Sequence, residues 1–349
     1  MQRYVASLAC VLMLSACASA ANAPIVPAIR ETAAVSATGD AADDPAIWVA
    51  PRADQSLVIA TQKQGGLYVF DLNGAIVQEA PGGRPNNVDL RADFPWADGA
   101  APIVGASDRS DNALVLWRFD PVARRLDPAP RARIATGFGE VYGFCLGRMG
   151  DDFVAIVTDK MGEIGVWRIT LGADGAPRGE RIAAYSLGSI TEGCVIDDDL
   201  GVYYLADELR GIWRVALDDP NGANKRQIGA VGDGNLVADV EGLTLWRGAE
   251  GRGVLIASVQ GRSRYALYDR QTNVYLGAFQ IGASADGRAD AVSGTDGIDV
   301  VSAPLGDAFP LGLFVAQDDE NTDPRALQNF KYVSWADINA RLEGGGPGR

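Results

Sequence analysis

Apolar strands joined by short polar turns recur at regular intervals along this chain. The recurring unit is an apolar strand, a polar turn and a second apolar strand with a late aromatic residue, and its copies start at residues 56, 102, 153, 201, 253 and 311. The first copy reads SLVIATQKQGGLYVFD, and the last reads LGLFVAQDDEN with NFKYVSW as its expected partner. A repeat of about 50 residues with about four short strands per unit is typical of β-propellers. The pattern therefore predicts an all-β chain with one six-bladed β-propeller over residues 31–342.

The ends of the chain depart from this pattern. Arg3 and a short apolar run predict a signal peptide over residues 1–17, followed by a linker over residues 18–30. The sequence LSAC has the shape of a bacterial lipobox and would place a lipid on Cys17, whereas ordinary signal-peptidase cleavage after Ala20 is the alternative. We therefore expect an exported protein, either periplasmic, secreted or an outer-membrane lipoprotein. The segment after Glu31 is expected to close the last blade, and residues 343–349 to be a disordered tail.

An acidic or amide-bearing turn precedes each hairpin and leads into an apolar strand. The six turns are DDPAIW, NNVDLR, EVYGFCL, TEGCVI, DVEGLTLW and TDGIDVV, in the same order as the hairpins. Corresponding positions of propeller blades lie on one ring around the central axis. We therefore expect one end of the channel to collect Asp44, Asn87 or Asp89, Glu140, Glu192, Glu241 and Asp296. One acidic residue at a strand entry is usually a turn former, but recurrence in all six units favours a site.

Composition limits the chemistry of such a site. The chain of 349 residues has a formal net charge of −14 and contains no histidine. This charge disfavours nucleic acid and anionic membranes as partners, so a lipid anchor is the only membrane contact expected. The absence of histidine excludes Ser-His-Asp and Cys-His catalysis and histidine-bound metals. Closely packed carboxylates repel one another unless cations lie between them, and Ca²⁺ is the oxygen-liganded cation that fits.

The hairpin turns carry a second set of polar residues, namely Lys63, Arg109, Lys160, Glu208, Gln260 with Arg262, and Asp318. The cations Lys63, Arg109 and Lys160 in an acidic protein suggest a polyanionic ligand that these cations and calcium hold together, and phosphate fits best. Each cation taken alone would more often be a solvated surface residue. The two cysteines of the folded part, Cys145 and Cys194, can pair in an oxidising compartment or remain buried free thiols.

These motifs resemble the β-propeller phytase family, whose members are calcium-dependent phosphatases of inositol hexakisphosphate (phytate). The stretches DAADDPAIW and NNVDLRADF resemble the two signatures of that family. Further similar stretches are EVYGF, TEG, DVEGLT, SRYALYDRQ, TDGIDV and GLFVAQDDEN, so the resemblance covers residues 31–335. The resemblance implies a six-bladed propeller, in agreement with the repeat count, and 3-phytase activity.

The resemblance also implies the residues of the site. Calcium ligands would be Asp43, Asp44, Asp89, Glu192, Glu208, Asp239, Glu241 and Asp296, with further structural calcium sites around Glu31, Asp290, Gln317, Asp318 and Asn321. Phosphate contacts would be Lys63, Asn87, Arg109, Tyr142 and Lys160, and catalysis would depend on Lys63, Arg109, Tyr142, Lys160, Glu192 and Asp296. The implied reaction is in-line attack on phosphorus by a calcium-bound water, with inositol phosphates bound as calcium complexes. A monomer is expected.

Three positions differ from the family pattern. Gln64 stands where the family often has a second lysine, and Asp108 and Asp159 precede the cations Arg109 and Lys160. Each difference lowers the positive charge near the expected anion site, so we expect weaker binding of a second, adjacent phosphate. Two alternative functions are open on the sequence. A calcium-dependent propeller lactonase or esterase would need few cations, and a non-catalytic calcium-stabilised binding propeller would have a flat apolar top surface.

Overall fold

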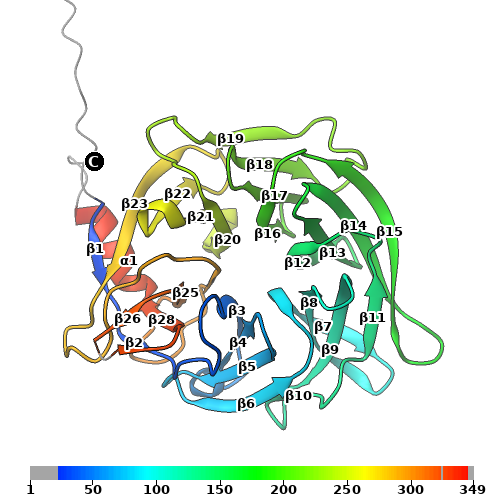
Figure 1. Ribbon diagram of the computed structural model, residues 1–349, viewed down its shortest axis with the longest axis horizontal. Helices are drawn as coiled ribbons and strands as arrows, with labels where there is room; N and C mark the ends of the chain where they lie inside the picture. Colours follow the sequence, from blue (N-terminus) through cyan, green and yellow to red (C-terminus); the bar gives the residue numbers. More distant parts are fainter. Residues whose placement is uncertain (1–22, 324, 345–349) are drawn as a thin grey trace, which may run out of the picture.

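Six β-sheets surround a central axis in the computed structural model, which describes residues 23–323 and 325–344 (Figure 1). Each sheet forms one blade, and the first strand of each blade contacts the first strands of the two neighbouring blades. These six first strands therefore form the wall of the central channel. The six-bladed β-propeller expected from the repeats is confirmed.

The strand boundaries follow the sequence repeats. Blade 1 contains β3 (Ala42–Trp48), β4 (Leu57–Gln62), β5 (Gly66–Asp71) and β6 (Ile76–Pro81). Blade 2 contains β7 (Pro85–Trp96), β8 (Gly99–Asp108) and β9 (Ala113–Asp120), and β9 also pairs with β10 (Arg125–Leu126) and β11 (Ala132–Ala135). Blade 3 contains β12 (Val141–Met149), β13 (Asp152–Asp159), β14 (Glu163–Leu171) and β15 (Pro177–Ser186).

The second half of the propeller repeats this arrangement. Blade 4 contains β16 (Thr191–Asp197), β17 (Val202–Asp207), β18 (Gly211–Ala216) and β19 (Arg226–Ala230). Blade 5 contains β20 (Val240–Arg247), β21 (Gly253–Val259), β22 (Arg264–Asp269) and β23 (Tyr275–Gly282). Blade 6 contains β24 (Ile298–Val301), β25 (Leu313–Asp318) and β28 (Asn329–Ser334). The remaining elements are the paired strands β26 (Asn321–Thr322) and β27 (Arg325–Ala326) and the 3₁₀ helices Ala53–Gln55, Ala249–Gly251 and Gln260–Arg262.

Strands inside a blade are continuous apolar runs because both of their faces are covered. β4 (LVIATQ) and β17 (VYYLAD) are buried at every position, whereas the outer strand β6 (IVQEAP) is exposed or half-buried throughout. The buried side chains form hydrophobic clusters, each of which lies between two neighbouring blades. Burial between blades therefore provides the main stabilisation of the propeller.

The N-terminal segment closes the propeller at two places. β1 (Ile25–Pro27) adds to blade 5 as a parallel partner of β23, and β2 (Arg30–Glu31) is the outer strand of blade 6, where it pairs with β28. The pairing continues beyond Glu31, since the amide of Val35 donates to the carbonyl of Gln328. The expected closing strand is therefore present, but the linker expected over residues 18–30 is too long: residues 25–27 and 30 belong to strands.

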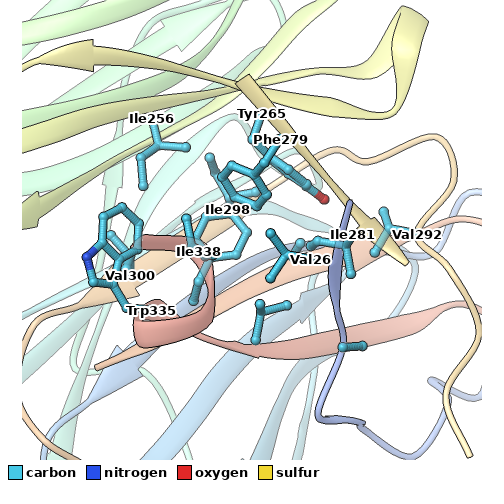
Figure 2. Packing of buried hydrophobic residues seen from close by; sticks show 14 of the residues in the cluster. Val26, Ile256, Tyr265, Phe279, Ile281, Val292, Ile298, Val300, Trp335 and Ile338 are labelled. Carbon is cyan, nitrogen blue, oxygen red and sulfur yellow. The ribbon is translucent and has the colours of Figure 1, made fainter. Parts of the chain in front are cut away.

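Blades 5 and 6 share a core with the C-terminal helix. α1 (Trp335–Gly344) places Trp335 and Ile338 against Phe279 of blade 5 and Val300 of blade 6, and Val26 of β1 completes the cluster (Figure 2). The helix extends to Gly344, so residues 343 and 344, expected in a disordered tail, are helical. Residues 345–349 lie outside the described part of the chain, as do the expected signal peptide and Cys17.

A disulfide links two neighbouring blades. Cys145 of β12 and Cys194 of β16 are bonded, with an S–S distance of 2.01 Å. The sequence was compatible with a disulfide or with two buried free thiols, and the disulfide is observed. Such bonds form and persist in oxidising compartments, in agreement with export. Among the described residues, no helix is both long and apolar enough to cross a membrane.

Candidate active site

A β-bulge interrupts the first strand of each of the first five blades at the same place. The register shifts lie between residues 42 and 45, 85 and 88, 141 and 144, 191 and 194, and 240 and 243. Each shift encloses a pair of residues, for example Asp43 and Asp44 in blade 1. In blade 6 the equivalent pair, Asp296 and Gly297, directly precedes β24. A bulge redirects the side chains that it carries. We use the name bulge ring for the first residue of each pair: Asp43, Asn86, Tyr142, Glu192, Glu241 and Asp296.

The second residue of the pair is glycine in blades 3 to 6, for a steric reason. A Cβ atom on Gly143 would lie 1.7 Å from the carbonyl oxygen of Glu192, and one on Gly193 would lie 2.0 Å from that of Glu241. Each bulge is therefore packed directly against the bulge of the next blade. This close approach brings side chains more than 200 residues apart into one cluster.

Carboxylates dominate one side of the bulge ring. Carboxylate oxygens of Asp43, Glu192 and Asp296 lie within 4.8 Å of one another, and so do those of Glu192, Glu208 and Glu241. Glu192 belongs to both groups, and Glu208 comes from the turn that follows β17. Buried oxygens of Glu192, Glu208 and Glu241 accept no hydrogen bond from the described part of the chain. Buried oxygens without donors are costly, and a cation among them would offset this cost.

The protonation of the cluster reflects its burial. Burial and the charge of Asp296 raise the pKa of Glu192 to about 7. Burial and the charge of Glu192 raise the pKa of Glu208 to about 7. Burial is also the main reason that the pKa values of Asp43 and Glu241 lie well above the usual range. A bound cation would reverse these shifts because it favours the ionised form.

Lys63 supplies a positive charge to one edge of the cluster. Its Nζ atom lies 2.9 Å from Asp40 Oδ1, 3.1 Å from Asp296 Oδ2 and 3.3 Å from Asp43 Oδ2. The lysine is buried, and the neighbouring carboxylates raise its pKa against the opposing effect of burial, so it remains charged. One ammonium cannot neutralise this many carboxylates, and the side formed by Glu208 and Glu241 has no cation among the described residues.

The uncharged members of the bulge ring face Glu192 from blades 2 and 3. Asn86 Nδ2 donates to Glu192 Oε1 at 2.5 Å. When the side-chain amide of Asn87 is oriented with its nitrogen toward Glu192, that nitrogen lies 3.2 Å from the same oxygen. Burial and the charge of Glu192 raise the pKa of Tyr142, so its hydroxyl stays protonated and can donate. Asn86 Oδ1 is a further buried oxygen without a donor in the described chain.

Two other hairpin-turn cations, Arg109 and Lys160, belong to the same two blades. Lys160 Nζ lies 4.9 Å from the centre of the Tyr142 ring and 3.2 Å from Glu140 Oε1. Arg109 Nη2 donates to the carbonyl of Lys63 at 3.4 Å. A cavity of about 380 Å³ opens over the ring, and its lining includes Lys63, Tyr142, Gln260, Glu241 and Asp296. The site is therefore divided, with cations on blades 1 to 3 and carboxylates on blades 4 to 6 and 1.

Two of the expected calcium ligands lie elsewhere. Asp44 Oδ2 accepts the backbone N–H of Val88 at 3.0 Å, and Asp89 Oδ2 accepts that of Leu146 at 2.8 Å. Each carboxylate thus joins its own blade to the next one, below the bulge ring. The expected ring differs from the bulge ring at three positions, where Asp43, Asn86 and Tyr142 are found and Asp44, Asn87 or Asp89, and Glu140 were expected. Asn87 nevertheless lies beside the ring, with its amide 3.2 Å from Glu192 Oε1.

The other expected residues fall into two groups. Asp239 is half-buried near Glu208, and the charge of Asp239 helps to raise the pKa of Glu208. Gln317 supports the ring because its Oε1 accepts the N–H of Asp296 at 2.9 Å. Another group lies apart from the ring, around the side chain of Lys331: Glu31, Asp290, Asp318 and Asn321. Of the five residues expected at structural calcium sites, Gln317 therefore contacts the ring, and the other four surround Lys331.

Two residues of the site were not predicted from the sequence. Asn86 and Asp40 are both part of the motifs noted there, but neither was assigned a role. The available signal was the glycine that follows Tyr142, Glu192, Glu241 and Asp296, because it marks the first bulge position. Blades 1 and 2 lack that glycine, so the position could not be identified in them.

Comparison with known proteins agrees with this arrangement. The chain matches the sequence profile of the family described as Phytase over residues 2–345. A 3-phytase of Bacillus subtilis (strain 168) is 42% identical over 330 residues, which cover 91% of this chain and 85% of that protein. The profile match spans all six blades and every residue of the bulge ring. With a six-bladed propeller and a match along nearly its whole length, the chain belongs to the phytase family.

Proposed function

We propose that this protein is a calcium-dependent 3-phytase, which hydrolyses phosphomonoesters of inositol hexakisphosphate bound as a calcium complex. Family membership and the activity named for the Bacillus subtilis relative support the substrate and the reaction. The calcium dependence is supported by buried carboxylate oxygens of Glu192, Glu208 and Glu241 that accept no hydrogen bond from the described residues. A protein with a net charge of −14 can bind a polyanion only if cations lie between them.

The residues present fit calcium at the bulge ring. Ca²⁺ takes six to eight oxygen ligands from carboxylates, amide oxygens and water. The oxygens available here come from Asp43, Asn86, Glu192, Glu208, Glu241 and Asp296. When bound there, calcium would supply neutralisation of phosphate oxygens and acidification of a water. Glu192 is the central ligand because it belongs to both carboxylate groups.

The side chains on blades 1 to 3 hold the phosphate in this proposal. Lys160 is half-exposed beside the Tyr142 ring, and its ion pair with the more exposed Glu140 is easily replaced. Arg109 carries a guanidinium that can bind two phosphate oxygens together. The Tyr142 hydroxyl keeps its proton and donates to an equatorial oxygen. Lys63 holds Asp43 and Asp296 in place and adds its charge to the site. These donors would stabilise charge that develops on the equatorial oxygens during transfer.

The differences from the family pattern affect the site less than their charges suggest. Asp108 Oδ1 accepts the amide N–H groups of Arg84 and Ser110, and its Oδ2 pairs with Arg133 at 3.0 Å. Asp159 Oδ1 likewise accepts the amides of Met161 and Glu163 within its own turn. Both carboxylates are therefore turn formers. Gln64 Nε2 donates to the carbonyls of Thr38 and Asp40, so it is turned toward that loop. We propose that the missing lysine charge at Gln64 weakens binding of a second phosphate.

We also propose that the protein acts as an exported monomer. The disulfide between Cys145 and Cys194 supports export. The lipobox-like sequence favours an outer-membrane lipoprotein anchored through Cys17 over a periplasmic or secreted form. Labelling of cells with a tagged fatty acid should mark the native chain and leave the Cys17→Ser variant unmarked, and equal labelling would remove the anchor from the proposal.

Substitution of Arg109 and Glu192 tests the site. Arg109→Ala and Glu192→Ala should each lower phosphate release from calcium phytate by about 100-fold or more, since each removes a group that contacts substrate or calcium. Both variants should remain folded, as measured by circular dichroism in calcium. Arg125→Ala is the matched control, because Arg125 is exposed on the short strand β10. Unchanged kinetics in both site variants would remove the site assignment.

A further inference from the structure

A fully buried lysine lies at the seam where the N-terminal segment closes the propeller. Lys331 of β28 is the register partner of Glu31 on β2, and its side chain is inaccessible to solvent. β28 lies between β2 and β25 in blade 6, with β26 close by (Figure 1). The N-terminal strand β2 and three strands from the C-terminal part of the chain therefore meet around one ammonium group.

Five oxygen atoms surround the Lys331 ammonium. Its three N–H groups match three hydrogen bonds, to Glu31 Oε2 at 2.5 Å, Asn321 Oδ1 at 2.7 Å and Asn329 Oδ1 at 3.1 Å. Two further carboxylates form ion pairs with it, Asp290 Oδ1 at 2.7 Å and Asp318 Oδ2 at 2.8 Å. Carboxylate and amide oxygens are ligands that calcium takes, but Ca–O distances are about 2.3–2.6 Å, and the centre here is occupied by the ammonium at mostly longer, hydrogen-bond distances.

The second oxygen of each buried aspartate is also satisfied. Asp290 Oδ2 accepts the amide N–H and the hydroxyl of Thr322, at 2.5 and 2.8 Å. Asp318 Oδ1 accepts the amide N–H of Ser293 at 2.8 Å. Each carboxylate thus has one oxygen toward the lysine and the other toward neutral donors. In the bulge ring, carboxylate oxygens without hydrogen-bond donors face one another. Asp290 Oδ1 and Asp318 Oδ2 also accept no hydrogen bond from the described residues, but each lies within 2.8 Å of the Lys331 ammonium.

We infer that the Lys331 ammonium is a built-in cation that holds the closure of blade 6, in place of a structural calcium ion. The residues around it do not fit a calcium ion as well, since the ammonium already lies on the point where their oxygens converge. Closure of the propeller is then independent of calcium, and calcium binding is confined to the bulge ring. The inference concerns only the seam and does not rest on the phosphatase reaction.

The Asp290→Asn variant of the full chain gives the primary test. Its thermal midpoint should fall by several degrees, and by the same amount in EDTA and in excess CaCl₂, because its partner is a lysine. The number of calcium ions bound per chain, measured by isothermal titration, should equal that of the native protein. Loss of a bound ion, or a fall in midpoint that appears only in calcium, would overturn the inference. Glu320→Gln is the matched control, since Glu320 is a nearby exposed carboxylate.

Removal of the lysine gives the complementary result. Lys331→Met leaves Glu31, Asp290 and Asp318 without their cation, so the thermal midpoint should fall further in EDTA than in calcium, and titration should detect one additional ion. An unchanged midpoint in EDTA would contradict the inference. If Lys331→Met does not fold, Asp290→Asn still decides the question. Glu241→Gln, measured beside them, should lose calcium from the bulge ring, so failure of that variant would count against the proposed function alone.

Discussion

The six residues of the bulge ring share one backbone geometry but differ in charge. Asp43, Glu192, Glu241 and Asp296 lie on adjacent blades, whereas Asn86 and Tyr142 occupy the two blades between Asp43 and Glu192. The cations Arg109 and Lys160 belong to those same two blades. Under the proposed function, the carboxylate side of the channel binds calcium, and the side with Arg109 and Lys160 binds phosphate. Single substitutions can therefore affect calcium and substrate separately.

Gly143, which follows Tyr142 of the bulge ring, provides a test of how the bulges pack. Gly143→Ala should destabilise the protein by about 3 kcal/mol or more, because its Cβ would overlap the carbonyl oxygen of Glu192. It should also reduce phosphate release, since Tyr142 and Glu192 would be displaced. Urea unfolding in calcium measures the first effect. Gly139→Ala is the control, as its Cβ would have no neighbour within 4 Å; equal stability of the two variants would show that the bulges are not packed as described.

The sequence predicted half of the ring at residue level. Glu192, Glu241 and Asp296 were assigned to it because each belongs to an acidic turn that leads into an apolar strand. In DDPAIW two acidic residues are adjacent, and only the bulge determines that Asp43 faces the site while Asp44 binds the N–H of Val88. A bulge shifts the alternation of strand side chains by one position, and no residue type marks it when the glycine is absent.

At the scale of elements, closure at the N-terminus was predicted only in part. The added strand of blade 6 was expected, but β1 was assigned to a linker. β1 is only three residues long and its partner β23 lies more than 250 residues away, so local pattern carries no sign of the pairing. The disulfide could not be predicted from the sequence for the same reason, since pairing of Cys145 with Cys194 depends on the distance between β12 and β16.

Residues of β1 provide the second prediction. Val26 is fully buried in the cluster shared by blades 5 and 6 and α1, whereas its neighbour Ile25 is 60% exposed. Val26→Ala should therefore lower the free energy of unfolding by about 2 kcal/mol, and Ile25→Ala by about 0.5 kcal/mol or less. Chemical denaturation of both variants in calcium provides the comparison. Similar small losses would indicate that β1 does not contribute to closure.

At the scale of the whole molecule, the buried carboxylates connect calcium, pH and stability. Glu192 and Glu208 have pKa values of about 7 in the folded chain against an ordinary value of 4.5. The folded state therefore binds more protons than the unfolded chain between about pH 4.5 and pH 7. Stability due to these groups is fully present below that window and is lost as the pH rises through it. Calcium should remove this loss, because it binds the ionised form.

The corresponding prediction concerns the chelated protein. In EDTA the thermal midpoint should decrease between pH 5 and pH 8, and in excess calcium the decrease should be absent or much smaller. Differential scanning calorimetry across this range measures both curves. Glu208→Gln should flatten the EDTA curve, because it removes one of the titrating groups. A midpoint in EDTA that rises with pH would contradict the electrostatic description of the ring.

We propose that the carboxylates bind calcium and that calcium is required for phosphate release. The most direct measurement is release of inorganic phosphate from phytate by protein stripped with EDTA, followed by titration with CaCl₂. We predict release at background level in excess EDTA, and full recovery when calcium exceeds the chelator. Full activity in excess EDTA would contradict the claim.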